Sequence, residues 1–433
     1  MKPAPRLIPL VLEWVLAGAV VASVIWTFAF FRQNGFLPQP FVFDTNDTFM
    51  DWFNTAYWAN NGGAFEVWGT IYPPLSFVFL DTLSLPGCYL ETSFYARDCD
   101  WLARGAILAC YLISVWVAWL AFRKANPNTA PMRTLAIALG LPLLFTLERG
   151  NLIIAAFPFF VIAHSEVTKS RAWRVFSAAV TINFKPYLVV PVFSYAVKRE
   201  WRAFELMGIA SVALYLVTLA LVGSGTPEEI ITNTAKWVEF QGGQVWNEVN
   251  YSTSFAPLLR IRTLNVPVLQ FVSSELVETI ELVAILAIRS TQVIALAALA
   301  AAWLQPRALP IYRLSAILFG TYIVTQSPGG YAQLFLLFLV FLEPWRRPGP
   351  IVALVCAYVL SLLGDWTITT IMELSLNSWL GSRDVNPIFG LTFGHFVRPG
   401  LVVLVVWALS FDTIAEVVRA HRQHRPSLGL APA

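Results

Sequence analysis

Three aspartates near the start of the chain are spaced so that a helix would place their carboxylates on one face. Asp44, Asp47 and Asp51 stand three and four residues apart, which is the spacing of neighbouring side chains on an α-helix. Carboxylates grouped in this way suit general-base chemistry, because one of them can take the proton of an attacking hydroxyl group. The alternative is a solvated loop helix that the aspartates cap, and the spacing alone favours that alternative.

Two basic residues stand where apolar segments are interrupted. Arg149 lies in a Glu-Arg-Gly-Asn stretch, and Lys185 directly precedes a proline. A cation at a membrane surface can contact a lipid phosphate, and arginine suits a two-pronged contact. Each side chain could equally extend its charged end toward water or pair with Glu148. The sequence leaves these alternatives open.

Signatures of other chemistry are absent. No set of His, Cys, Asp and Glu has the spacing of a zinc site, and neither a P-loop nor a G-x-S-x-G motif occurs. Among the four histidines, only His395 falls in a segment predicted for the outer, more acidic side of the membrane. Arg398 lies three residues after it. We therefore expect no metal, no cofactor and no nucleic-acid partner.

The composition requires a lipid environment. Of the 433 residues, 57% are hydrophobic and 13% are charged, whereas a soluble protein has nearer to about a quarter charged residues. The 17 tryptophans are more than a buried core usually holds, and tryptophan favours the membrane–water interface. We predict an all-α integral membrane protein with about 10–12 transmembrane helices.

Ten apolar stretches are long enough to cross a membrane. They lie near residues 7–31, 102–122, 133–147, 151–167, 203–222, 278–303, 311–326, 331–345, 350–371 and 397–414. Two further stretches, 72–86 and 174–197, are interrupted by proline. Each is predicted to be either a re-entrant hairpin or a pair of short helices that lines a cavity. The first stretch is predicted to be a retained helix, since no cleavage site is obvious after it.

The basic residues predict the orientation. With a cytoplasmic N-terminus, 18 of the 29 lysines and arginines fall in seven short inner segments, as the positive-inside rule expects. The outer side then has loops at about 32–101, 223–277 and 372–396, and residues 1–433 form a single membrane domain. Cys88 and Cys99 both fall in the first outer loop, where they form a disulfide or stay free.

Several short motifs follow one another in an order that resembles the polyprenol-phosphate-sugar-dependent glycosyltransferases of the C-type membrane fold. Family eighty-seven, which includes mannosyltransferases of phosphatidylinositol mannoside synthesis, looks most similar, and the resemblance covers most of the chain. The matching elements are an Asp before an aromatic-rich segment (Asp51 to Ala59), Tyr72-Pro73-Pro74, Gly150-Asn151, Ile182 to Tyr187, Arg199 to Arg202, Asn250 to Ser254 with Leu258 to Arg260, and Ser327-Pro328. After the last of these the family often has a histidine-containing stretch, where this chain has Gly329-Gly330-Tyr331-Ala332-Gln333.

The resemblance implies transfer of a sugar, a mannose-like hexose or a pentose, from a polyprenyl-phosphate donor to a lipid or glycan hydroxyl. The reaction would take place on the periplasmic or extracytoplasmic face of the plasma membrane, during assembly of the cell envelope. Membrane lipids would surround the protein, and no nucleotide is needed there because the donor carries its sugar on a lipid phosphate.

The residues receive roles under this interpretation. Asp51 is the expected base because it matches the family's Asp, with Asp47 or Asp44 assisting or substituting. The expected donor-phosphate contacts are Arg149, Lys185, Arg260 and Arg398. The expected acceptor or sugar contacts are Tyr72, Asn151, Tyr331 and His395.

Two other classes of function would show a similar composition. A transporter or flippase of lipid-linked sugars would also have broken helices and intramembrane charge, but the chain shows no inverted repeat and its acidic cluster lies outside the membrane midplane. A non-catalytic assembly subunit would keep its function after the carboxylates were removed. Fold resemblance does not decide between these functions.

Overall fold

The computed structural model describes residues 7–41, 45–241, 251–252, 254–255, 259, 273–326 and 328–424. It is mostly helical, and six of its helical segments are long and apolar enough to cross a membrane by length and composition. These segments are α1 (Leu7–Asn34), α5 (Trp101–Ala125), the pair α6 (Ala130–Ala138) and α7 (Leu141–Arg149), α11 (Trp201–Val222), α15 (Ser274–Leu304) and α19 (Gly394–His424). The chain is therefore a helical membrane protein, as its composition predicts.

Shorter helices fill the space between the long ones. They are α8 (Ile153–His164), α9 (Arg171–Phe184), η2 (Pro186–Val192), α10 (Phe193–Val197), η4 (Pro306–Ala308), α16 (Ile311–Gln326), η5 (Gly330–Ala332), α17 (Gln333–Val340) and α18 (Pro348–Leu360). Residues of α8, α16 and α17 form much of the apolar core, together with α5 and α19. Four of these apolar stretches are shorter than a full span, so the count of ten spans stays a prediction.

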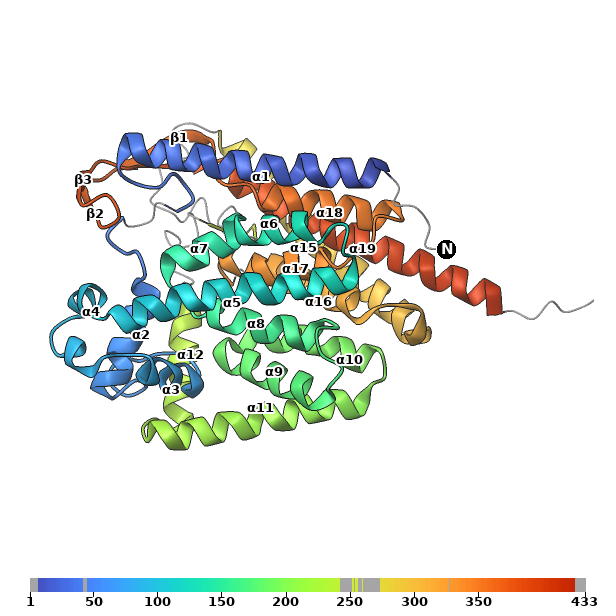
Figure 1. The fold of residues 1–433 in the computed structure, drawn as a ribbon. Coiled ribbons are helices and arrows are strands. Elements are labelled where there is room, and N and C mark those ends of the chain that lie inside the picture. The colour runs from blue at the N-terminus through green and yellow to red at the C-terminus, as the bar shows by residue number, and fades with distance from the viewer. Residues whose placement is uncertain are drawn as a thin grey trace, which may run out of the picture.

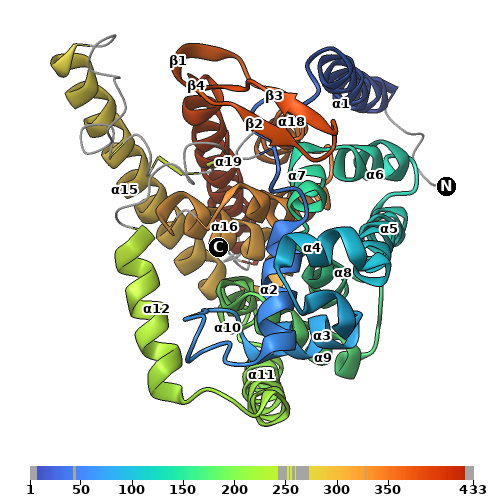
Figure 2. The ribbon, with the colours of Figure 1, turned by 90° about the vertical axis from the view of Figure 1, so that its left-hand side faces the viewer.

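The short helices between α1 and α5 and the strands gather at one end of the helical bundle (Figure 1). We name it the outer end after the orientation that the sequence predicts. It holds α2 (Met50–Asn61), α3 (Pro74–Thr82), η1 (Pro86–Tyr89), α4 (Ser93–Cys99) and four short strands, while α12 (Pro227–Gln241) links α11 toward α15 (Figure 2). The start of α1 and the end of α19 lie at the opposite, inner end. Cys88 and Cys99 form a disulfide bond with a Cα–Cα distance of 5.6 Å, which ties η1 to α4.

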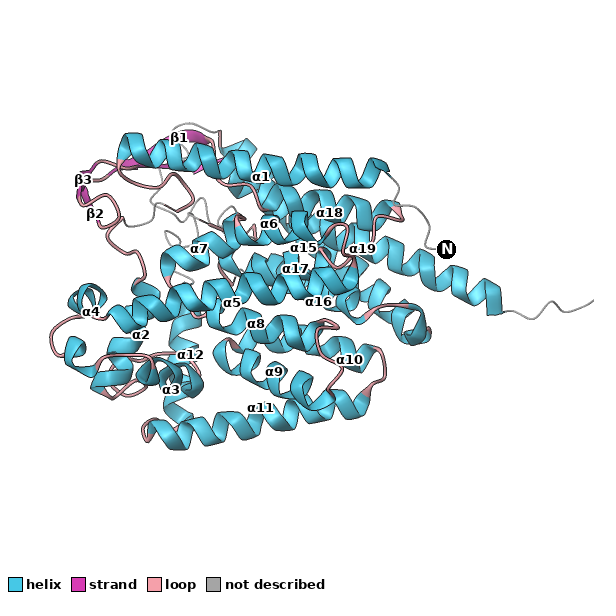
Figure 3. Ribbon diagram, in the orientation of Figure 1, coloured by secondary structure: helices cyan, strands magenta, loops and turns pink. Residues whose placement is uncertain are grey.

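The prediction of the span at 350–371 and the loop at 372–396 is wrong at its boundary. Helix α18 ends at Leu360, and β1 (Thr367–Glu373), β2 (Leu376–Ser378), β3 (Arg383–Val385) and β4 (Ile388–Thr392) follow. Strand β1 pairs with β4 and β2 with β3, both antiparallel, so the segment is one nested hairpin, the only sheet structure in the part of the chain described (Figure 3). Gly364, at a φ of 84°, lies in the connection between α18 and β1, and the β-branched Thr and Ile residues of β1 favour a strand.

The two proline-interrupted stretches form short helices. Residues 72–86 contain the nine-residue helix α3, which begins at Pro74 and is too short to span. Residues 174–197 contain α9, η2 and α10, with Lys185 at the break between α9 and η2. The break arises because Pro186 lacks an N–H and disfavours helical backbone at the residue before it.

A network of buried charges joins the helices at the inner end. Arg133 on α6 pairs with Glu13 on α1 at 2.6 Å, and Glu13 also accepts a hydrogen bond from Tyr358 on α18 at 2.9 Å. Arg313 on α16 donates from Nε to Glu343 at 2.6 Å and pairs with Asp412 and Glu416 on α19 at 3.0 and 2.8 Å. These charges are buried in pairs, as burial requires.

Candidate active site

The carboxylate of Asp51 is held by one side chain from the end of α7 and one from the turn that follows it. Arg149 Nη2 donates to Asp51 Oδ1 at 3.0 Å, and Asn151 Nδ2 donates to Oδ2 at 2.7 Å. Arg149 Nη2 also pairs with Asp47, so one guanidinium joins two of the three predicted aspartates. The Asp51 side chain is 22% exposed, and each of its oxygens keeps a second lone pair for a ligand proton. We call Asp47, Asp51, Arg149 and Asn151 the Asp51 cluster.

The backbone brings α2 against the 148–151 turn. Phe49, the residue before α2, has a φ of 67°, and its N–H donates to the Glu148 carbonyl at 2.7 Å. Gly150 has a φ of 63°, and a Cβ atom placed there would lie 2.9 Å from the Phe49 oxygen and 3.1 Å from Trp52 Cβ. Glycine is therefore required both for the backbone conformation and for the close approach. This contact places Asp51, in the first turn of α2, opposite Asn151.

The amide of Asn151 has a defined orientation. Its Oδ1 accepts a hydrogen bond from the Ile153 N–H at 3.1 Å, at the start of α8, which leaves the NH₂ group directed at Asp51. Asn151 is 1% exposed, so a buried amide aligns the carboxylate. The sequence-predicted sugar contact is thus, in the structure, a partner of the predicted base.

Replacement of Gly150 with alanine is expected to separate the two halves of the Asp51 cluster. The added Cβ atom would meet the backbone of Phe49 and the side chain of Trp52, and the positive φ would be strained for any L side chain, by about 1 kcal/mol or more. We expect a lower thermal midpoint in detergent and turnover reduced by about ten-fold or more, since a displacement near 1 Å can have that effect. Gly105, where an added Cβ meets nothing within 4 Å, provides the matched Gly→Ala control; equal behaviour of the two variants would contradict the positioning role.

Lys185 lies close to Tyr72, beside the Asp51 cluster. Its Nζ atom is 4.3 Å from the centre of the Tyr72 ring, a cation–π distance. In the part of the chain that is described, no carboxylate pairs with Lys185. Burial, together with the nearby Asp51 carboxylate, raises the pKa of Tyr72 well above its usual value, so its phenol stays protonated and can donate a hydrogen bond.

Aromatic side chains line the same region. Tyr187, two residues after Lys185, stacks on Tyr322 with ring centroids 5.7 Å apart. Tyr331 stacks on Phe145 with ring centroids 6.3 Å apart. Phenol groups combine an apolar ring with a polar end that can donate and accept hydrogen bonds.

A second polar cluster is centred on the carboxylate of Asp365. Its carboxylate accepts hydrogen bonds from Arg398 Nη2 at 2.8 Å, from Thr392 Oγ1 at 2.6 Å and from the Gly394 N–H at 2.9 Å. His395 Nδ1 lies 2.9 Å from Thr392 Oγ1. Arg398 and His395 therefore belong to this Asp365 cluster and not to the Asp51 cluster.

Tyr251 joins the Asp365 cluster to Phe145 and Gln333. Its ring lies 5.2 Å from the Arg398 guanidinium carbon and 4.9 Å from the Phe145 ring, and its hydroxyl donates to Gln333 at 3.0 Å. The sequence analysis did not predict Asp365 or Gln333 as site residues.

The feature that could have indicated Asp365 is its position directly after Gly364, where a long apolar run ends.

Several of the residues quoted from the sequence lie outside the described residues, namely Asp44, Asn250, Leu258, Arg260 and Ser327. The described residues contain no group of three or more His, Cys, Asp and Glu side chains that could hold a metal ion. The roles assigned to Asp44 and Arg260, and the expected absence of a metal or cofactor, remain predictions.

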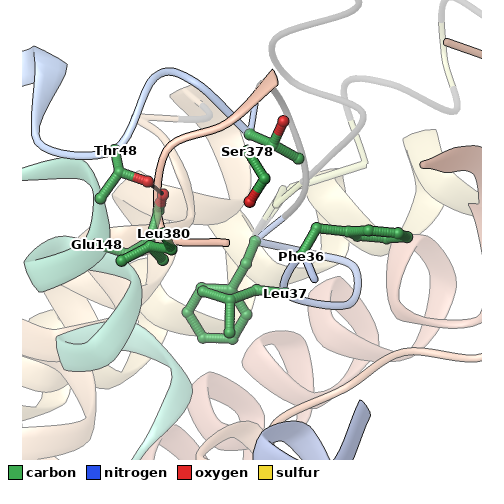
Figure 4. Close-up of a pocket in the computed structure, with 8 residues that line it drawn as sticks. Phe36, Leu37, Thr48, Glu148, Ser378 and Leu380 are labelled. Carbon is green, nitrogen blue, oxygen red and sulfur yellow. Dashed lines mark hydrogen bonds between the residues drawn. The ribbon is translucent and has the colours of Figure 1, made fainter. Parts of the chain in front are cut away.

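A small hollow lies next to the cluster, beneath the β2–β3 turn. Phe36, Leu37, Thr48, Glu148, Ser378 and Leu380 surround it (Figure 4), together with Phe41 and Thr45. Thr48 donates a hydrogen bond to Glu148 at 3.0 Å at its edge. None of Asp51, Lys185 and Tyr72 lines this hollow, so we assign no substrate to it.

Comparison with known proteins adds no relative: no family model, no curated protein and no solved structure matches the chain.

Proposed function

We propose that the protein is a membrane glycosyltransferase that moves a mannose-like hexose or a pentose from a polyprenyl phosphate to a lipid or glycan hydroxyl. The observation that carries the proposal is the carboxylate of Asp51, fixed by Arg149 and Asn151 at the outer end, with Lys185 and Tyr72 beside it. The motif order described above supports the same reaction class. The Cys88–Cys99 disulfide in the first outer loop supports an oxidising, extracytoplasmic location for this end.

The reaction is a single displacement. The acceptor oxygen attacks the anomeric carbon, the bond from that carbon to the phosphate oxygen breaks, and the phosphate leaves with the electron pair. Asp51 takes the acceptor proton. Asn151 and Arg149 keep the carboxylate in one orientation, and Tyr72 and Tyr331 contact the sugar or the acceptor.

The leaving phosphate needs a cation, and Lys185 is our first choice. Its ammonium group contacts the Tyr72 ring and no carboxylate of the described chain, whereas Arg149 is bonded to Asp47 and Asp51. We therefore assign Arg149 first to holding the base. Arg398 pairs with Asp365, and its contact with a donor phosphate, like that of Arg260, stays a prediction.

Replacement of Lys185 with alanine is expected to weaken donor binding by about ten- to a hundred-fold, because a charge-assisted contact to phosphate contributes about 1.5–3 kcal/mol. Acceptor binding should change less, since the lysine would contact only the donor. Titration of the purified protein with a polyprenyl-phosphate sugar measures the effect. Lys236→Ala, on the exposed side of α12, is the matched control. Wild-type donor affinity in the Lys185 variant would make this lysine structural.

The function itself is tested with purified protein in detergent, radiolabelled polyprenyl-phosphate sugars and a membrane lipid extract. Transfer of label to a new lipid or glycan product supports the proposal. If the label stays on the donor while sealed vesicles show the donor crossing the bilayer, the protein is a transporter or flippase. If neither occurs and a partner enzyme needs the protein, it is an assembly subunit.

A further inference from the structure

Arg289 is exposed on the apolar surface of α15. Its neighbours on that surface include Leu286, Val293 and Leu296, which are 58%, 68% and 69% exposed. Residues at these spacings share one face of a helix. In a membrane protein such an exposed apolar face contacts lipid, so the arginine points from a transmembrane helix toward the lipid.

The depth of Arg289 follows from the inner end of α15. Trp303 packs against Trp201 with ring centroids 5.7 Å apart, and the Arg199 guanidinium lies 4.9 Å from its ring, as is typical of an aromatic and basic interface. Arg289 precedes Trp303 by fourteen residues, or about 21 Å of helix at ~1.5 Å per residue. In a hydrocarbon core about 30 Å thick, this depth is in the outer third.

The partner that the structure shows for the guanidinium is neutral. Arg289 Nη1 donates to Gln292 Oε1 at 3.2 Å, and Gln292 Nε2 donates to Thr325 on α16 at 3.5 Å. Among the residues that the structure describes, no carboxylate forms an ion pair with Arg289. A membrane-embedded arginine without an anion costs at least about 2.5 kcal/mol. The side chain is long enough to extend its charge toward the outer headgroups, where lipid phosphates are the available anions.

We propose that Arg289, with Gln292 beside it, binds the phosphate of a membrane lipid in the seam between α15 and α16. Arginine matches phosphate by paired N–H donors, and the Gln292 amide and Thr325 hydroxyl add polar groups along the same seam. Three residues before Thr325, Tyr322 stacks on Tyr187, so the seam leads toward Lys185. Figure 2 shows α15 at the edge of the bundle, next to α16. The lipid is either an anionic phospholipid or a polyprenyl phosphate, and its binding does not depend on sugar transfer.

The test uses the full-length protein in lipid nanodiscs of neutral lipid, titrated in separate arms with phosphatidylglycerol and with polyprenyl phosphate. Arg289→Gln should bind at least one of the two lipids about ten-fold or more weakly than the wild type, and Arg289→Lys should recover part of the loss. Arg307→Gln, an exposed arginine in the turn η4 at the inner end of α15, is the matched control and should leave binding unchanged.

Each outcome decides the proposal. Loss in the polyprenyl arm supports a docking site for the donor, and loss in the phosphatidylglycerol arm supports a site for a bilayer phospholipid. Wild-type affinity of Arg289→Gln for both lipids overturns the proposal. If that variant does not fold, Gln292→Leu tests the same seam, because it keeps the Arg289 charge but removes the neighbouring amide. A several-fold weaker lipid affinity of this variant supports the site. Unchanged affinity for both lipids overturns it. Since neither arm contains a sugar, failure here is separate from failure of glycosyl transfer.

Discussion

Replacement of Asp51 with asparagine is expected to lower turnover at least about a hundred-fold, because asparagine has the same shape but cannot accept a proton. Donor binding should survive, since Lys185 and Tyr72 are unchanged. Measurement of initial rates and donor affinity on the same preparation separates the two effects. Because the proton transfer occurs only in the transition state, we expect kcat and kcat/KM of the variant to fall by the same factor.

The hydrogen bonds of Asp51 predict how well this variant folds. An asparagine can present its one oxygen to Arg149 or to Asn151, but not to both, so one bond of the cluster is lost. Arg149 keeps its pair with Asp47, and the loss of unfolding free energy should therefore be about 1 kcal/mol. A variant that fails to fold would identify Asp51 as a structural carboxylate.

Two further substitutions complete the experiment. Asp47→Asn should reduce turnover less than Asp51→Asn, because Asp47 is bonded to Arg149 and stands one turn before the family's Asp position. Asp81→Asn removes an exposed carboxylate from α3 at the same outer end and should leave turnover unchanged. Near-normal turnover of a folded Asp51→Asn protein would refute the base assignment and direct attention to Asp47, Asp44 and His395.

The long helices and their approximate positions in the sequence were predictable, because long apolar runs determine them. The stretches predicted at 7–31, 102–122 and 203–222 correspond within a few residues to α1, α5 and α11, since long apolar runs have no other stable form in lipid. The hairpin after α18 was missed because Leu, Trp and Ile residues between Leu360 and Met372 extend the apolar run of the helix into β1. A hydropathy pattern also does not detect one glycine at positive φ in the connection.

The contacts of the site were less accessible to sequence reasoning. The sequence placed Asp51 and Asn151 on the same predicted side, but 100 residues separate them, and no local pattern predicts that they touch. The contact depends on Phe49 and Gly150, two residues at positive φ whose backbones meet. Pairing of Arg149 was considered with Glu148, its sequence neighbour, whereas the structure pairs it with Asp47 and Asp51.

The largest effect on stability is expected from the inner end. Replacement of Arg313 with methionine would leave Glu343, which is 0% exposed, without the guanidinium that it contacts. A buried charge that loses its partner costs about 3–5 kcal/mol. Asp412 and Glu416 would remain paired with Arg347, whose Nη1 lies 3.3 and 2.7 Å from their carboxylate oxygens. The cost therefore arises mainly at Glu343. Denaturant unfolding in mixed micelles measures the change in free energy.

A second substitution distinguishes loss of pairing from loss of volume. Removing both charges, as in Arg313→Met with Glu343→Met, should recover much of the stability, because replacing a buried ion pair by apolar side chains of similar size is often neutral or stabilising. Arg346→Met, an exposed arginine at the same end, should be near neutral. Wild-type stability of Arg313→Met alone would contradict the pairing, and no recovery in the double variant would assign the loss to packing around Arg313. Turnover of the refolded double variant should be normal, since these side chains lie at the end opposite Asp51 and contact none of the cluster.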